Sequence, residues 1–220
     1  RTTAAEYPAW GNAAAVDDCL GRADDSTRYG VVSRLLGAAP QAVYQAMGSL
    51  FLQPERTLFF NTYGTNPKTI WGSYRTSLAS EQFASRMSGD EIHSPDTTVE
   101  HFRALTKPWN PYGLIAINSS GGSTGWSVGG GGWTDDFPVG VPSAIHVTHS
   151  GSASDPYNPD TLAGRALWGG TYWYFGSTAE PFLTAFQPPR YYAPRLLRGA
   201  PFAATFRLRT DDRFWSPWRL

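Results

Sequence analysis

Short apolar runs and helical spacings of apolar residues follow one another along most of this chain. Four runs rich in β-branched, aromatic or aliphatic residues predict buried strands, at Arg56–Tyr63, Gly113–Asn118, Ala144–Thr148 and Thr171–Phe175. A shorter strand or a turn is predicted at Glu91–Ser94. Apolar residues at helical spacing predict helices at Arg28–Leu36, Gln41–Phe51, Ser77–Met87, Asp96–Leu105 (capped by Asp96 or Thr97), Thr161–Trp168, Phe182–Phe186 and Tyr192–Leu197, while Phe202–Leu208 fits either type. Because strands separated by helices build mainly parallel sheets, we expect an α/β domain with a mainly parallel sheet flanked by helices.

The amino-terminal segment differs from the rest of the chain. Residues 1–26 are rich in Ala, Asp and Gly and lack a clear period, which predicts an extended or partly helical arm. Tyr7 and Trp10 would anchor this arm on a neighbouring surface, or the arm would lie over its own domain. We expect residues 27–220 to form a single domain, since a chain of 220 residues suits one core. The chain starts at Arg1 rather than Met, so we also expect a fragment of a longer protein.

Charge and composition exclude some classes of function. The chain has 18 basic and 18 acidic side chains, and this zero net charge argues against binding to nucleic acid. No apolar stretch approaches the length of a transmembrane helix. The single Cys19 forms no internal disulfide. Aromatic residues make up 15% of the chain and include nine Trp. Most of them are expected in the core, and such a surplus also suits a surface that protein partners bind.

Four segments together resemble a known family: Arg56–Tyr63, Tyr112–Gly122, Ile145–Ala153 and Leu162–Phe182. In the last of these a helix, a Gly-Gly turn, an aromatic strand and a Gly-Ser pair follow one another. The order resembles the caspase–hemoglobinase fold, and most closely the gingipain-like cysteine peptidases of bacterial secreted or cell-surface families. The resemblance implies a three-layer sandwich and an extracytoplasmic location, in the periplasm or at the cell surface.

The resemblance also implies where catalytic residues would stand. Active members carry a His-Gly pair after one strand, with His as the base, and a nucleophilic Cys after the next strand. Here Ser120-Gly121 stands at the first position and Ser150 at or beside the second. Serine cannot replace imidazole as a base near neutral pH. The leading prediction is therefore a non-catalytic gingipain-like domain that acts as an accessory or scaffolding subunit in a larger protein assembly.

Two other functions stay open. A peptidase or esterase would use Ser150 as nucleophile, with His149 as its base and Asp155 as the third group. Neighbours on a strand point to opposite faces, and His146 lies about 13 Å from Ser150 in an extended chain, so this triad needs an unusual loop. A carbohydrate- or surface-binding module would instead use exposed rings of Trp126, Trp133 and Trp173.

A few His, Asp and Glu residues and a Gly-rich stretch are the candidates for metal or cofactor binding. His146 and His149 lack a third ligand for a zinc site. Asp135, Asp136 and Asp155 would hold a structural calcium ion with loop carbonyls, or would form solvated turns. Glu180 would face the cleft where an active relative binds substrate, or would cap the helix that begins near Phe182. We expect no organic cofactor, since the Gly-rich stretch Gly129–Gly132 lacks the ending of a phosphate-binding loop.

Overall fold

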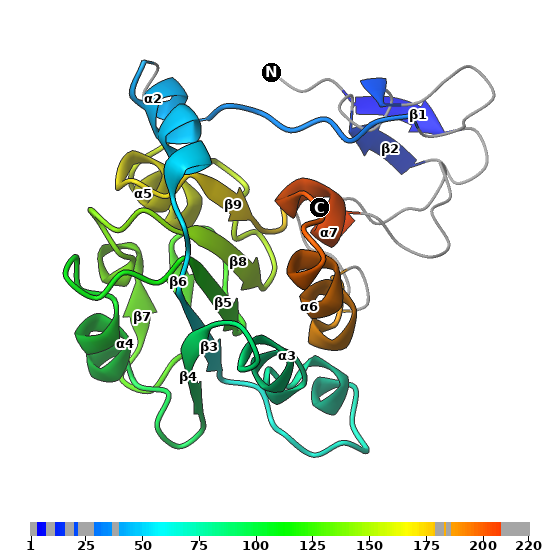
Figure 1. Ribbon diagram of the computed structural model, residues 1–220. Coiled ribbons are helices and arrows are strands. Elements are labelled where there is room, and N and C mark those ends of the chain that lie inside the picture. Colours follow the sequence, from blue (N-terminus) through cyan, green and yellow to red (C-terminus); the bar gives the residue numbers. More distant parts are fainter. Residues whose placement is uncertain are drawn as a thin grey trace.

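A five-stranded parallel sheet forms the centre of the computed structural model, which describes residues 4–7, 12–15, 20–21, 29–36, 40–178, 183 and 186–207 (Figure 1). The strands lie in the order β4-β3-β5-β8-β9, and each neighbouring pair is parallel. Their bounds are β3 (Arg56–Asn61), β4 (Ser88–His93), β5 (Leu114–Asn118), β8 (Ala144–Thr148) and β9 (Trp173–Phe175). The predicted α/β class with a parallel sheet is confirmed.

Helices cover both faces of this sheet and give the fold three layers. Leu58 and Phe60 of β3 pack in a core with α4 (Val99–Leu105) and α5 (Leu162–Trp168). Phe59 points the other way, into a core with α3 (Ser77–Phe83), α6 (Pro189–Leu197) and α7 (Phe202–Arg207). Figure 1 shows α4 and α5 to the left of the sheet and the other three helices to its right. The alternation follows from the two-residue period of a strand.

Smaller elements surround the sheet. The hairpin of β6 (Gly125–Trp126) and β7 (Gly132–Trp133) lies between β5 and β8 in the chain, and it is followed by the 3₁₀ helix η3 (Thr134–Asp136). Before β3 lie α2 (Gln41–Gly48) and the 3₁₀ helix η1 (Ser49–Phe51), and after β3 lies η2 (Trp71–Tyr74). Within the amino-terminal segment, β1 (Ala4–Tyr7) pairs with β2 (Asn12–Ala15) in an antiparallel sheet. Trp10 lies outside the described residues.

Several predicted elements need correction. The helix expected at 28–36 is wrong over its described part, because residues 29–36 form no helix. β-Branched Val31 and Val32 follow Gly30 here, and all three disfavour a helix. The backbone N–H groups of Tyr29 and Gly30 instead donate to the Gly21 carbonyl, at 2.9 and 3.1 Å. Most of the short helix expected from Phe182 lies outside the described residues.

The cap of α4 also differs from the prediction. Thr98, rather than Asp96 or Thr97, caps this helix, and its side chain accepts a hydrogen bond from the His101 N–H at 3.2 Å. Thr98 has the extended backbone that a cap residue needs, whereas the two residues before it belong to the turn that leads into the helix. Further along, α3 ends at Phe83, four residues before the predicted end, and the ambiguous segment from Phe202 is a helix.

Candidate functional site

The carboxyl-terminal edge of the sheet brings together polar side chains from three strands. In the strand register Asn61 lies opposite Asn118, and Asn118 lies opposite Thr148, so β3, β5 and β8 end side by side. The Asn118 side-chain amide donates to Asn61 Oδ1 at 3.2 Å and to the Tyr74 carbonyl at 2.5 Å. After β3 the chain forms β4 on one side of β3, and it then forms β5 on the other side of β3. Ligand sites of open α/β sheets lie at such a reversal of strand order.

His149 is the central side chain of this edge. It follows β8 directly and is only 3% exposed. Its Nε2 lies 3.0 Å from the Gly122 carbonyl oxygen, which can only accept, so Nε2 carries the proton and donates. Its Nδ1 lies 3.0 Å from Ser119 Oγ and therefore accepts from that hydroxyl. Burial lowers the pKa of His149 to about 4, although the bond to Gly122 acts in the opposite direction. The imidazole is neutral at neutral pH.

Tyr63 holds the loops after β5 and β8 in place. Its hydroxyl shares one proton between two carbonyl oxygens, that of Ser119 and that of Thr148, the latter at 2.7 Å. The Ser119 N–H also donates to the Thr148 carbonyl, at 3.3 Å. The Trp71 ring lies against Tyr63, with ring centroids 4.6 Å apart. Burial raises the pKa of Tyr63, so its hydroxyl stays protonated and remains a donor.

Ser119, which is not among the predicted catalytic residues, is the serine that bonds to His149. Ser120 is exposed, Ser150 is half-buried, and Ser119 is completely buried. Both ring nitrogens of His149 bond to groups other than Ser150 and Asp155. The reasoning from sequence missed Ser119. Strand register would have found it, since residues 119 and 149 each follow the last paired residues of neighbouring strands.

The tryptophans predicted to form a binding surface have different environments. The prediction for Trp126 is wrong, because this ring is 3% exposed and packs against Phe60 and Phe102. Gly132 makes this packing possible, since a Cβ there would lie 2.4 Å from Trp126 Nε1. Trp133 is 66% exposed, and Trp173 is half-buried beside helix α7. Glu180 lies outside the described residues.

The acidic residues considered for calcium have other partners. Asp136 is buried and accepts from the Arg103 guanidinium and from the Trp133 N–H, the latter at 2.6 Å. Asp135 is exposed and lies 3.9 Å from Arg165. Asp155 is exposed in the loop before α5. Within the described ranges, no three His, Cys, Asp or Glu side chains gather in a way that could hold a metal ion.

His146 lies apart from His149, in the second core. The ring is fully buried among aromatic side chains, and Phe206 stacks on it with centroids 4.2 Å apart. Tyr192 meets it edge-on at 5.4 Å. Neither ring nitrogen has a hydrogen-bond partner among the residues that the structure describes. Burial lowers the pKa of His146 to about 3, so this ring is a neutral part of the core.

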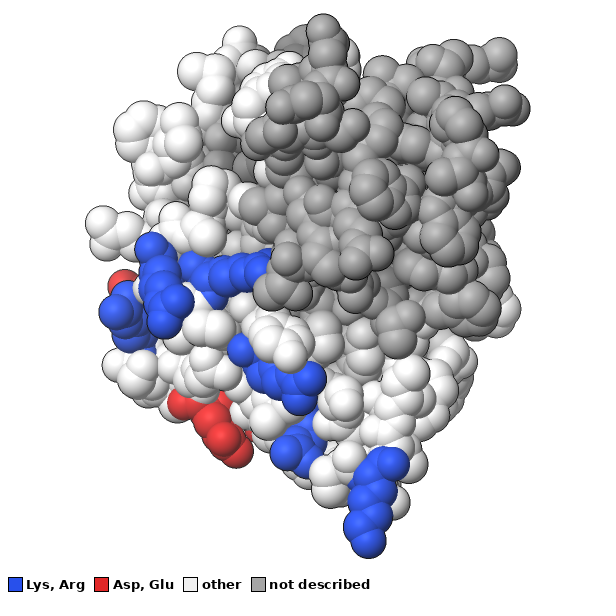
Figure 2. Space-filling view, turned by 90° about the vertical axis from the view of Figure 1, so that its right-hand side faces the viewer, with Lys and Arg blue, Asp and Glu red and all other residues white. Residues whose placement is uncertain are grey.

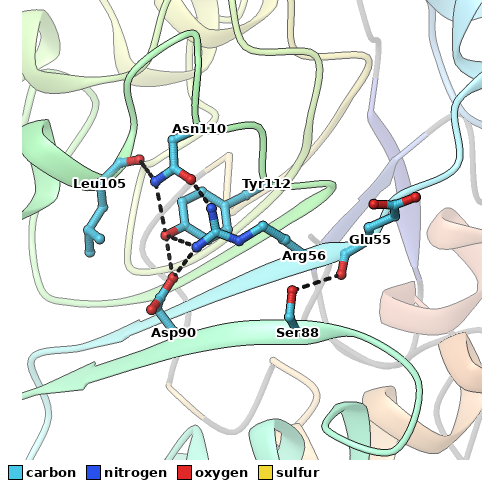
Figure 3. Close-up of polar contacts among 7 residues, drawn as sticks. All are labelled: Glu55, Arg56, Ser88, Asp90, Leu105, Asn110 and Tyr112. Atoms are coloured by element: carbon cyan, nitrogen blue, oxygen red, sulfur yellow. Dashed lines mark hydrogen bonds and ion pairs between the residues drawn. The ribbon is translucent and has the colours of Figure 1, made fainter.

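A second polar cluster stabilises the opposite, amino-terminal edge (Figure 3). The Arg56 guanidinium lies 2.8 Å from Asp90 Oδ2, bonds to the Asn110 side chain, and lies over the Tyr112 ring at 4.6 Å. The Tyr112 hydroxyl donates to the same Asp90 oxygen at 2.5 Å. Burial, followed by the bond to Asp90, raises the pKa of Tyr112 to about 12. This cluster ties β3 and β4 to the start of β5, which is a structural role.

Basic side chains gather on the side that carries α3 and α6 (Figure 2). Two arginines, one just after α3 and one in α6, bond to backbone carbonyls of neighbouring segments. Arg86 donates to the Leu197 carbonyl at 2.7 Å, and Arg195 donates to the Thr205 carbonyl at 3.2 Å. These two arginines therefore serve helix packing.

Comparison with models of protein families and with curated proteins found no match to this chain. Across the described part of the chain, none of the helices combines the length and the apolar character needed to cross a bilayer.

Proposed function

We propose that this chain is a non-catalytic domain that acts as an accessory or scaffolding subunit in a larger protein assembly. The hydrogen bonds and the burial of His149 are the main support for this proposal. Its imidazole is buried and neutral, and its two nitrogens bond to the Ser119 hydroxyl and the Gly122 carbonyl, so that the loop after β8 is linked to the loop after β5. A general base works best when its pKa lies near the working pH, and burial lowers the pKa of this group to about 4. A ring held in this way serves as a structural link between loops.

The resemblance to gingipain-like peptidases supports the same proposal. Ser120 and Ser150 stand where that family carries its base and its nucleophile. A domain that keeps the fold and lacks those groups retains a surface that partners can bind. The extracytoplasmic location implied by the resemblance belongs to this proposal. The burial of Trp126 counts against the alternative of a carbohydrate-binding module, which relied on three exposed rings.

One observation favours a second candidate, a serine hydrolase that uses Ser119. Ser119 Oγ lies 3.0 Å from His149 Nδ1, and the Gly122 carbonyl orients the ring, as a nucleophile, base and orienting group would be arranged. Ser119 has no exposed surface, so a substrate would reach it only after the loops after β5 and β8 had separated. The same opening would be needed before His149 could serve a nucleophile at Ser150.

Covalent labelling separates these functions. The full chain is treated with a fluorophosphonate probe, and labelled peptides are identified by mass spectrometry, with Ser119→Ala and Ser150→Ala as matched variants. Hydrolysis of p-nitrophenyl acetate is measured in parallel. We expect no serine labelling above that of the heat-unfolded chain, and equal background hydrolysis in all three proteins. Stoichiometric labelling that disappears in either variant would overturn the proposal and establish that serine as a nucleophile.

A further inference from the structure

Helix α2 and the following η1 turn their apolar side away from the domain. Four smaller or polar residues on one side of the helix are half-buried, namely Ala42, Gln45, Ala46 and Ser49. The exposed side carries larger apolar side chains, namely Val43, Tyr44, Met47, Leu50 and Phe51. Leu50 is 80% and Phe51 85% exposed. A surface helix ordinarily buries its apolar stripe, so this orientation is reversed.

The described contacts between α2 and the domain are few. Gln41 Nε2 donates to the Trp168 carbonyl at 3.1 Å, which places the start of α2 beside the end of α5 (Figure 1). The Trp168 side chain is itself 44% exposed. No residue of α2 is buried. A helix of eight residues is marginal on its own and gains most of its stability from packing of its apolar face. The outward face is therefore suited to contact with another molecule.

The chemistry of this face narrows the kind of partner. Residues 35–54 contain no charged side chain, between Arg34 and Glu55. A strongly acidic or basic partner would find no counter-charge on this stretch. A helix that lies in a membrane surface ordinarily carries Lys or Arg on its polar face, whereas here that face carries Gln and Ser. A two-fold symmetric contact sets the same surface of both copies against each other. Because this face carries no charge, such a contact brings no like charges together.

The size of the face also fits a symmetric pair. Its five large apolar side chains and the neighbouring Trp168 offer roughly 600 Å² per copy. Two such faces would bury roughly 1,200 Å², which is at the lower end for specific protein interfaces. The uncharged and partly aromatic composition matches the centre of such an interface.

We infer that a second copy of this chain docks on the outward face of α2 and η1, so that the chain forms a two-fold symmetric dimer through this helix. The inference rests on the proposed function as an assembly subunit and names its first partner and the surface used. Exposed rings of one copy, such as Tyr44 and Phe51, would fill the spaces between the apolar side chains of the other. The dimer contact does not involve His149 or its bonding partners at the carboxyl-terminal edge of the sheet.

Sedimentation equilibrium and light scattering on the full chain test this inference. The wild-type chain, of 24.1 kDa, is expected to reach twice its mass at micromolar to tens of micromolar concentration. Leu50→Glu and Phe51→Glu would each weaken the dimer about 30-fold or more, as truncation at an interface hot spot does. Tyr157→Glu is the matched control, because Tyr157 is 60% exposed in the loop before α5, and this variant should dimerise like the wild type.

Three results would overturn the inference. The first is a wild-type chain that stays monomeric at about 100 µM, because its affinity for itself would then be weaker than such an interface allows. The second is a dimer unaffected by Leu50→Glu, and the third is a monomer that co-sediments with phosphatidylcholine vesicles through the same face. Circular dichroism and thermal unfolding of each variant establish that it is folded. Any of these results would reject α2 and η1 as the dimer surface without testing the proposed accessory role. Labelling at Ser119 or Ser150 would remove the accessory role whatever the oligomeric state.

Discussion

Acidification should destabilise this domain, because two buried histidines resist protonation in the native state. His146 and His149 are buried as neutral rings, and burial lowers their pKa values to about 3 and about 4. In the unfolded chain both rings take up protons as the pH falls below about 6.5. The unfolded state thus binds more protons than the native state between pH 6.5 and pH 4. Stability is fully present above this window and is lost as the pH falls through it.

The magnitude follows from the two pKa values. At pH 5 an unfolded imidazole is almost fully protonated, while each native ring is almost fully neutral. Each histidine then lowers the free energy of unfolding by about 2 kcal/mol, and the pair by about 4 kcal/mol, relative to pH 7.5. That loss is a large share of the stability of an ordinary domain.

Urea unfolding at intervals between pH 7.5 and pH 5 measures the effect. His146→Phe is the informative variant, because the phenyl ring keeps the contact with Phe206 and cannot take up a proton. Its free energy of unfolding should fall by about 2 kcal/mol over this interval, half of the wild-type loss. A wild-type stability that is flat over the interval would refute the reasoning. So would a His146→Phe variant with the wild-type slope.

Two further substitutions test the packing of the site and of α5, each by urea unfolding at pH 7.5. Ser119→Ala leaves the buried Nδ1 of His149 without its partner and should destabilise the domain by about 1–3 kcal/mol; a change within experimental error would show that the bond contributes nothing. Gly164→Ala improves helix propensity by about 1 kcal/mol, yet its Cβ would lie 1.8 Å from the Asn158 carbonyl oxygen, so net destabilisation is expected. Gly48→Ala, in a helix with open space around the new Cβ, is the control and should be neutral or stabilising.

The sheet could be predicted from the sequence because buried parallel strands are continuous apolar runs. Ile115 and Ile117 on one face and Leu114 and Ala116 on the other belong to one such run, and all four are buried. The segment beginning at Tyr29 was harder to interpret, because a few apolar residues at helical spacing can also occur in irregular backbone. The N–H groups of Tyr29 and Gly30 bond to the Gly21 carbonyl, and no periodicity in the sequence reports such a contact.

The sequence predicts that His149 lies at the carboxyl end of a strand, and the structure places it directly after β8. The partner of His149 depends on side-chain direction, which the sequence does not report, and Ser150 follows only from the resemblance to gingipain-like peptidases. Ser119 lies on the neighbouring strand, where only the register reveals it. The burial of Trp126 depended on Gly132, whose missing side chain makes room for the ring. Composition alone gave no sign of this.

The Tyr63 hydroxyl couples three strand ends at the carboxyl-terminal edge of the sheet. It comes from just beyond β3 and contacts carbonyl groups that follow β5 and end β8. Displacing any one of these three strand ends strains or breaks the bonds to the other two. Ser119 and His149 therefore belong to one cooperative opening unit, and their backbone amides should exchange with solvent together rather than one at a time.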